Sequence, residues 1–134
     1  MSDYNTQIID EFRGSGGKVG GRWEGRNLLL LRTTGRKSGR PHTTPMVYTA
    51  GEDRLLVYAS KAGAPKHPDW YLNLVADPHV TVEAGSDRYD AIATPLEGEE
   101  RDREFALQAE RVPAFAEYQQ QTERVIPVVS LRRA

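Results

Sequence analysis

A short segment of this sequence gathers cations and hydroxyl groups that could do chemistry together. Residues 32–40 read RTTGRKSGR, which places four basic and three hydroxyl side chains on one turn between two apolar or β-branched runs. The glycines let backbone N–H groups approach an oxygen atom closely, while Arg36, Lys37 and Ser38 can donate hydrogen bonds to it. This composition indicates a site for a phosphate or a carboxylate. An ordinary solvated hairpin turn has the same composition, so spacing alone leaves both interpretations open.

A second segment, residues 59–74, combines small residues, two lysines and the start of a helix. It reads ASKAGAPKHPDWYLNL, and the small residues at its beginning would let a flat ring lie against the backbone. The helix would present unpaired N–H groups and its positive dipole end to an anion near Lys61 and Lys66. Trp70 could stand beside that ring, although a core position is the more common place for so large an aromatic side chain.

The sequence lacks what several other classes of site require. There is no cysteine, which excludes disulfides, thiolate metal ligands and cysteine nucleophiles. No G-x-S-x-G nucleophile elbow is present. His42, His67 and His79 lack close metal-ligand spacing, so no metal site is expected. Glu99 and Glu100 indicate a solvated helix face and not a catalytic pair of carboxylates.

Length and composition describe one globular domain of 134 residues, with 38% hydrophobic and 28% charged residues. The formal charge of -1, from 18 basic and 19 acidic side chains, argues against nucleic acid as a partner. No apolar run approaches the roughly 20 residues that span a bilayer, and the N-terminus lacks a signal-peptide pattern. A cytoplasmic location is therefore expected, with peripheral membrane contact by the N-terminal helix left open.

The spacing of apolar residues predicts six strands and four helices. Glycines between Gly14 and Gly21 follow a helix and match neither a Walker nor a dinucleotide pattern, so they indicate a flexible connector. Trp70, Tyr71, Leu74 and Val75 recur on one helical face. The expected strands are 28–34, 41–48, 55–59, 80–84, 89–95 and 125–131, and the expected helices are 4–13, 68–77, 99–108 and 113–118.

These elements predict an α+β fold with a mostly antiparallel sheet. Short hairpin connections join several of the strands, with residues 85–88 forming one such turn. Helices interrupt the strands at irregular points, and no strand–helix repetition typical of a parallel sheet appears. Pro127 indicates that the last strand begins there or lies at an edge. A sheet of this kind can curl into a barrel.

Three segments resemble the deazaflavin-dependent nitroreductase family of actinobacteria. They are Leu30–Arg40, Ala59–Leu74 and Thr122–Val129, and the resemblance covers about residues 26–131 in the same order. It implies a split β-barrel similar to those that bind flavin mononucleotide. It also implies an F420-dependent oxidoreductase that reduces quinones, nitroaromatics or activated enones. Residues 1–25 would then be the helix and connector, and residues 26–134 the coenzyme-binding barrel domain.

The resemblance also implies a role for individual residues. Coenzyme F420 carries a phosphodiester and an acidic tail, which Arg36, Lys37 and Ser38 would hold. Its ring would lie on the loop after the third strand. The remaining implied contacts are Ser60, Lys61, Ala62 and Gly63 along the ring, and Lys66, Trp70 and Asn73 completing the cleft. The protein would orient the coenzyme while the coenzyme supplies the reactivity.

The acceptor side departs from the family's nitroreducing members, which carry several tyrosines after the charged helix. Residues 112–118 read VPAFAEY, so only Tyr118 keeps a phenol there, and Phe115 cannot donate a hydrogen bond. This favours a quinone or an enone over a nitro compound. Ser60 or Tyr118 could orient the acceptor oxygen or pass a proton, although water would serve as well, and Tyr118 could instead be a packing residue.

Three alternatives to this enzyme stay open from the sequence. The chain could bind or store coenzyme F420 without turning it over. It could be a related barrel reductase that uses flavin mononucleotide. It could bind nucleic acid through residues 32–40, against its near-neutral charge. Monomer and homodimer are both open.

Overall fold

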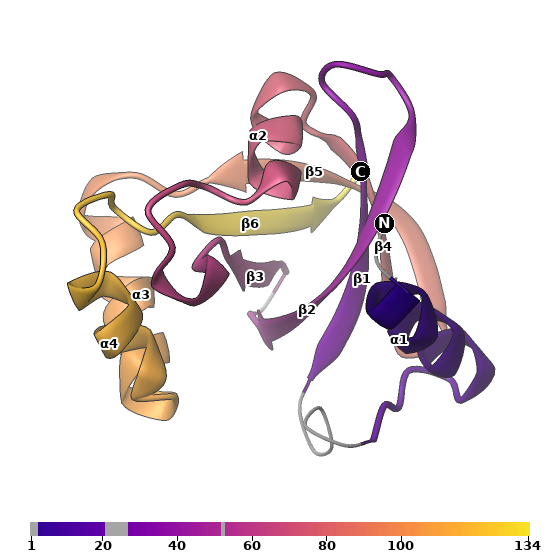
Figure 1. Ribbon diagram of the computed structural model, residues 1–134, viewed down its shortest axis with the longest axis horizontal. Coiled ribbons are helices and arrows are strands. Elements are labelled where there is room, and N and C mark those ends of the chain that lie inside the picture. The colour runs from indigo at the N-terminus through magenta and orange to yellow at the C-terminus, as the bar shows by residue number, and fades with distance from the viewer. Residues whose placement is uncertain (1–2, 21–26, 52) are drawn as a thin grey trace.

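In a computed structural model of the chain, six strands form a closed barrel with helices at its sides (Figure 1). The structure describes residues 3–20, 27–51 and 53–134. The strands are β1 Leu28–Thr34, β2 Pro41–Ala50, β3 Leu55–Tyr58, β4 His79–Ala84, β5 Asp87–Pro95 and β6 Val128–Arg133. The helices are α1 Asp3–Gly14, the 3-10 turn η2 Lys61–Gly63, α2 Asp69–Ala76, α3 Gly98–Arg111 and α4 Ala114–Gln120.

The barrel order is β1-β2-β3-β6-β5-β4, and every pairing between neighbouring strands is antiparallel. The α+β barrel predicted from the sequence is therefore confirmed. β2 pairs with β1 from Pro41 to Val47, whereas its other edge pairs with β3 only from Tyr48 to Ala50. Among the described strands, none pairs with that second edge between residues 41 and 47. The barrel wall is consequently open beside the first half of β2.

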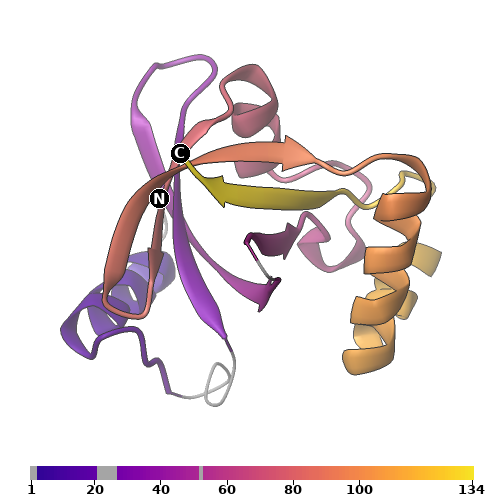
Figure 2. The same cartoon turned by 180° about the vertical axis from the view of Figure 1, so that it is seen from behind.

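The core explains why the run Leu28–Leu31 has no polar residue. Side chains alternate between the two faces of a strand, so a strand that is apolar throughout needs cover on both. Leu29 and Leu31 are buried inside the barrel, while Leu28 and Leu30 pack against α1 outside it. α1 and the α3–α4 pair lie at opposite ends of the barrel, as Figures 1 and 2 both show.

The end of the chain differs from the prediction. β6 begins at Val128 and runs to Arg133, whereas the pattern predicts a strand from 125 to 131. Val125 is 62% exposed, and Pro127 stands just before the strand, where it lacks an N–H group to donate. The Pro127 carbonyl instead accepts a hydrogen bond from the Ala59 N–H at 2.9 Å. Pro127 thus marks the start of a strand that lies between β3 and β5.

Two smaller differences from the prediction concern the β4–β5 hairpin and α2. β5 begins at Asp87, so only two residues remain between the two strands and the turn is shorter than predicted. Val75 is 56% exposed, so the apolar face of α2 predicted from sequence is buried only at Leu74 and partly at Trp70 and Tyr71. Helices α2 and α4 both begin directly after a proline, as their sequences indicate.

The N-terminal segment packs against the barrel. Ile8, Ile9 and Phe12 of α1 share an apolar cluster with Leu28 and Leu30 of β1. A Cβ atom added at Gly17 would lie 2.6 Å from the Cα atom of Gly85, so these two backbone segments are in close contact there. Gly21 and the domain boundary expected near residue 25 lie outside the described residues, and the flexible connector stays a prediction.

Candidate functional site

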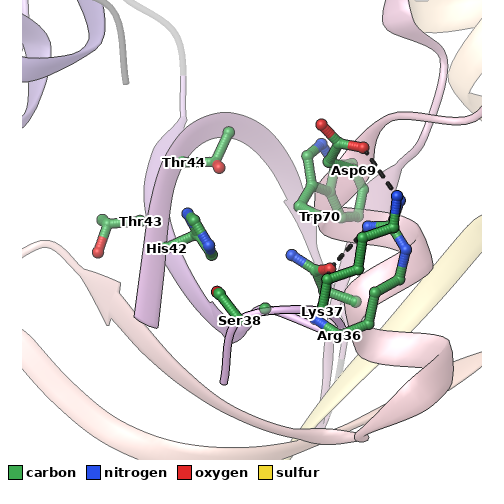
Figure 3. A pocket seen from close by; sticks show the side chains of 10 residues that line it. Arg36, Lys37, Ser38, His42, Thr43, Thr44, Asp69 and Trp70 are labelled. Carbon is green, nitrogen blue, oxygen red and sulfur yellow. Dashed lines mark hydrogen bonds and ion pairs between the residues drawn. The ribbon is translucent and has the colours of Figure 1, made fainter. Parts of the chain in front are cut away.

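A cavity of about 440 Å³ lies where the β1–β2 turn, the first half of β2 and α2 meet (Figure 3). The turn contributes Gly35 to Ser38, β2 contributes residues 42–44, and α2 contributes Asp69, Trp70 and Asn73. The predicted anion-binding turn therefore shares one cavity with the helix of the second predicted segment, whereas the predicted ring contacts Ser60, Lys61 and Gly63 are not among the residues that line it. The open edge of β2 gives this cavity access to backbone as well as to side chains.

Arg36 is tied to α2 by a buried amide. The side-chain oxygen of Asn73 accepts hydrogen bonds from the Arg36 backbone N–H at 3.2 Å and from its guanidinium at 2.9 Å. Asn73 is 4% exposed, and its amide donates to the Thr33 hydroxyl at 3.4 Å. Asp69 adds an exposed ion pair to the same guanidinium at 3.4 Å. Asn73 therefore fixes the β1–β2 turn against α2, and Arg36 has part of its donor capacity occupied.

Lys37 and Ser38 keep donors free to bind an anion. Lys37 is exposed, and within the described part of the chain its ammonium has no acidic partner. The Ser38 hydroxyl oxygen accepts from the Arg40 N–H at 3.2 Å, which leaves its own hydrogen free to donate. Gly35 is buried on the same turn, and a Cβ there would come within 2.7 Å of Ser38 Oγ and 2.8 Å of His42 Nε2. The glycine thus leaves room for these two side chains at the cavity.

A second cavity of about 490 Å³ adjoins the first and shares Arg36 and Asp69 with it. Its other lining residues include Lys61, Lys66 and Arg124, so four cations face this space against one carboxylate. Among the described residues, no ion pair to an acidic side chain forms at Lys61, Lys66 or Arg124. An excess of positive charge of this kind attracts an anionic ligand.

The loop after β3 lies beneath α4. Lys61 has a φ of 46° and Gly63 a φ of 79°, both in the left-handed region. A Cβ at Gly63 would lie 2.9 Å from the Tyr118 carbonyl oxygen and 2.7 Å from the side chain of Gln121. The glycine is therefore required by the approach of α4. In the prediction from sequence, the small residues of this loop let a ring lie against them. At Gly63, the small residue makes room for α4.

The two residues considered as catalytic, Ser60 and Tyr118, lie on either side of this contact. Ser60 is half-buried at the start of the loop and precedes η2. Tyr118 is half-buried on α4, with its ring 5.5 Å from that of Phe115. Phe115 in turn meets the Tyr58 ring edge-on at 5.4 Å. Tyr118 thus packs in an aromatic cluster next to the loop. Its role in orienting an acceptor or passing a proton stays a prediction.

Several lining residues were not predicted. His42, Thr43 and Thr44 line the first cavity from β2 (Figure 3), and the sequence offers only one signal for them, their place directly after the cationic turn. Arg124 lines the second cavity from a segment that is distant in sequence. Within the described residues, no group of three or more histidine, aspartate or glutamate side chains could hold a metal ion.

His67 lies in the second cavity beside Arg124. Burial, together with the positive charge of Arg124, lowers the pKa of His67 below its ordinary value of 6.5. The Arg124 guanidinium lies 3.1 Å from Nδ1, and because an arginine can only donate, Nδ1 must be unprotonated there. The native protein consequently favours the neutral imidazole.

This shift predicts a loss of stability in acid. Between the lowered pKa and 6.5 the unfolded chain binds more protons than the native one, so unfolding becomes easier as pH falls through that window. In His67→Asn the amide oxygen can accept from Arg124 without titrating. Thermal unfolding measured from about pH 7.5 to about 5.5 should therefore depend less on pH in the variant than in the wild type. Equal slopes would contradict the role of His67.

The comparisons with known proteins bear on this geometry. The family model described as F420H(2)-dependent quinone reductase matches residues 5–133. This chain belongs to that family. An F420H(2)-dependent quinone reductase of Mycobacterium tuberculosis is 38% identical over 126 residues, which cover 91% of this chain and 85% of that protein. The resemblance drawn from the three sequence segments is confirmed, with quinone reductase as the family's description.

Solved structures agree with the fold of this F420H(2)-dependent quinone reductase family member. One described as an F420-H2 dependent reductase is 42% identical, covers 80% of this chain and 95% of that chain, and has a TM-score of 0.72. Another, described as a domain-swapped dimer, is 37% identical over 97% of this chain and 98% of that chain, with a TM-score of 0.74. A haem storage protein of Vibrio cholerae, 19% identical with a TM-score of 0.63, shares the fold alone.

The residues present fit an F420-type coenzyme. Its acidic end requires cationic and hydroxyl donors, and Lys37, Ser38, Lys61 and Lys66 supply them along two adjoining cavities. For its flat ring, the loop after β3 reaches the second cavity at Lys61 and Pro65, whereas Ser60 and Gly63 line neither cavity. Trp70, half-buried, gives the first cavity an aromatic side chain.

Proposed function

We propose that this chain binds coenzyme F420 across the two cavities and reduces a quinone with it. The observation that carries the proposal is the ammonium of Lys37, which has no acidic partner among the described residues and lies in a cavity that shares Arg36 and Asp69 with a second, cationic one. When bound, the reduced coenzyme supplies a hydride. The protein's own part is to hold the acidic end, orient the ring and shield the acceptor from water.

The proposed contacts lie in the two cavities and along the loop after β3. Lys37 and Ser38, with the remaining donors of Arg36, hold the phosphate or the acidic tail. Ser60, Lys61, Ala62 and Gly63 line the ring. Lys66 and Trp70 complete the cleft, and Asn73 acts by fixing Arg36, because its oxygen already accepts two bonds from that residue.

The proposed acceptor is a quinone in preference to a nitro compound. Phe115 and Tyr118 pack in an apolar cluster with Tyr58, and Phe115 has no hydrogen to donate to a nitro group. A flat, largely apolar quinone or an enone is compatible with such a surface. Tyr118 or Ser60 is the proposed group that orients the acceptor oxygen or passes a proton, with water as the alternative.

Assembly and location are proposals too. The relative described as a domain-swapped dimer supports a homodimer for this chain. In the part of the chain that the structure describes, no helix has the length and apolar character to cross a membrane. A cytoplasmic location is proposed, and peripheral membrane contact by α1 stays a prediction.

Turnover tests the proposal. Purified protein should bind oxidised F420 in a fluorescence titration and should oxidise the reduced coenzyme when menadione is added. The measurement is the appearance of oxidised coenzyme, compared with the same mixture without protein. If binding occurs but reduced coenzyme persists at the protein-free rate across a panel of quinones, the chain stores the coenzyme and does not turn it over. A yellow preparation with a flavin spectrum would instead support flavin mononucleotide.

A further inference from the structure

We propose that Arg124 is a positioning residue that holds the loop of residues 59–64 in the shape that binds the coenzyme. This inference rests on the proposed function, and it assigns a role to a residue outside the predicted contacts. Arg124 lies in the segment between α4 and β6, about sixty residues along the chain from the loop.

The guanidinium of Arg124 donates to three carbonyl oxygens of this one loop. Nε donates to Ala64 at 2.9 Å, Nη1 to Ala59 at 3.0 Å and Nη2 to Ser60 at 2.7 Å. Ala59 and Ser60 precede η2, whereas Ala64 follows it. A single planar group therefore joins both ends of the loop and fixes their separation.

The loop needs such support from outside. Its own backbone hydrogen bonds are Gly63 N–H to the Ser60 carbonyl and Ala64 N–H to the Lys61 carbonyl, each at 3.0 Å. Lys61 has a left-handed φ of 46°, which side chains other than glycine rarely adopt. A residue in that conformation persists only where its surroundings impose it, and the bonds from Arg124 surround it on both sides.

Arg124 is itself held in place and directed at these carbonyls. Its own carbonyl accepts from the Gln119 amide at 2.8 Å, and its N–H donates to the Thr122 hydroxyl at 3.4 Å. It is half-buried, and no carboxylate pairs with it in the described ranges 3–20, 27–51 and 53–134. Burial lowers the pKa of Arg124 from its ordinary value. The group thus serves hydrogen bonding to the loop instead of a surface ion pair.

The same loop faces the proposed binding site. Lys61 and Arg124 both line the second cavity, and α4 packs on Gly63 from the opposite side. A change in the distance between Ala59 and Ala64 would move Lys61 within that cavity. The loss of Arg124 should therefore weaken coenzyme binding even though another residue makes the contact.

Lysine substitution separates this role from that of charge alone. Arg124→Lys keeps the charge but cannot reach three carbonyls in one plane. The matched control is Arg54→Lys, because Arg54 is also a half-buried arginine, and its guanidinium pairs with Glu100 at 3.1 Å, at the end of β3 away from the loop. We expect the dissociation constant for oxidised F420 to rise at least about tenfold in Arg124→Lys and to stay within about twofold in Arg54→Lys. An Arg124→Lys affinity within twofold of wild type, or an equal loss in Arg54→Lys, would overturn the proposal.

Amide hydrogen exchange supplies a readout without coenzyme. In the wild-type protein, the Gly63 and Ala64 amides should exchange as slowly as those of neighbouring β3. In Arg124→Lys, the same two amides should exchange at least about tenfold faster than in the wild type. Rapid exchange of these amides in the wild type would overturn the proposal, even if the variant failed to fold. A wild-type protein that protects the loop yet binds no F420 would contradict the proposed function while leaving the hold of Arg124 on the loop intact.

Discussion

Gly63→Ala is expected to destabilise the protein by about 2–5 kcal/mol and to abolish detectable coenzyme binding. The left-handed φ of 79° costs an alanine about 1–2 kcal/mol, and overpacking against a neighbour adds about 1–3 kcal/mol. The added Cβ would come within 2.9 Å of the Tyr118 carbonyl oxygen, a backbone atom of α4 that cannot rotate away. Either α4 or the loop must shift, and both border the proposed ring site.

Gly16→Ala is the matched control for this prediction. Gly16 has a φ of 70°, but a Cβ there would meet nothing within 4 Å. The Gly16→Ala variant should therefore lose only about 1–2 kcal/mol of stability, the cost of the left-handed conformation, and should bind coenzyme normally. Chemical denaturation measures the first quantity and fluorescence titration with oxidised F420 the second. Equal effects of the two substitutions would show that the contact between α4 and the loop contributes nothing.

Lys37→Ala should weaken the binding of oxidised F420 by about 1.5–3 kcal/mol, or about 10- to 150-fold, while the fold stays intact. Lys37 is exposed in the first cavity and has no acidic partner among the described residues, so its removal leaves no buried charge unpaired. Thermal unfolding without coenzyme should consequently be unchanged. The loss in affinity should diminish as salt concentration rises, because the contact is electrostatic.

Arg40→Ala provides the control on the same turn. Arg40 is an exposed cation three residues from Lys37, but it does not line either of the two cavities. Its removal should change the affinity by less than about threefold, since surface charges at a distance are screened by salt. If both variants lost the same affinity, the turn would act through its overall charge and Lys37 would have no specific role.

The sequence was most informative where the physical cause is local. Alternating and continuous apolar runs predicted the strands, and proline and glycine predicted where helices and turns begin, because both depend on neighbours along the chain. β1 has the predicted bounds, and α2 begins directly after Pro68. The composition of residues 32–40 likewise predicts donors for an anion, since cations, hydroxyls and glycines are adjacent there, and the turn does line the first cavity.

The details that failed were those in which distant packing decides. Val75 has the right spacing for the buried face of α2, yet its side chain is exposed. Residues 125–127 fit the strand pattern, but they are not part of β6, which begins at Val128. The chain just before them instead contacts the loop after β3 through Arg124. Spacing gives the face on which a side chain lies and not whether another element covers that face.

What the sequence by itself determined is the set of elements, the cationic turn and the resemblance to a coenzyme-binding family. Only the tertiary structure decided which donors are free. The fold places Asn73 against Arg36, 37 residues away, and so occupies Arg36, while Lys37 has no acidic partner in the part of the chain that the structure describes. It also places Arg124 on the loop of residues 59–64. These pairings depend on strand register and chain closure, which couple residues that have no local relation in the sequence.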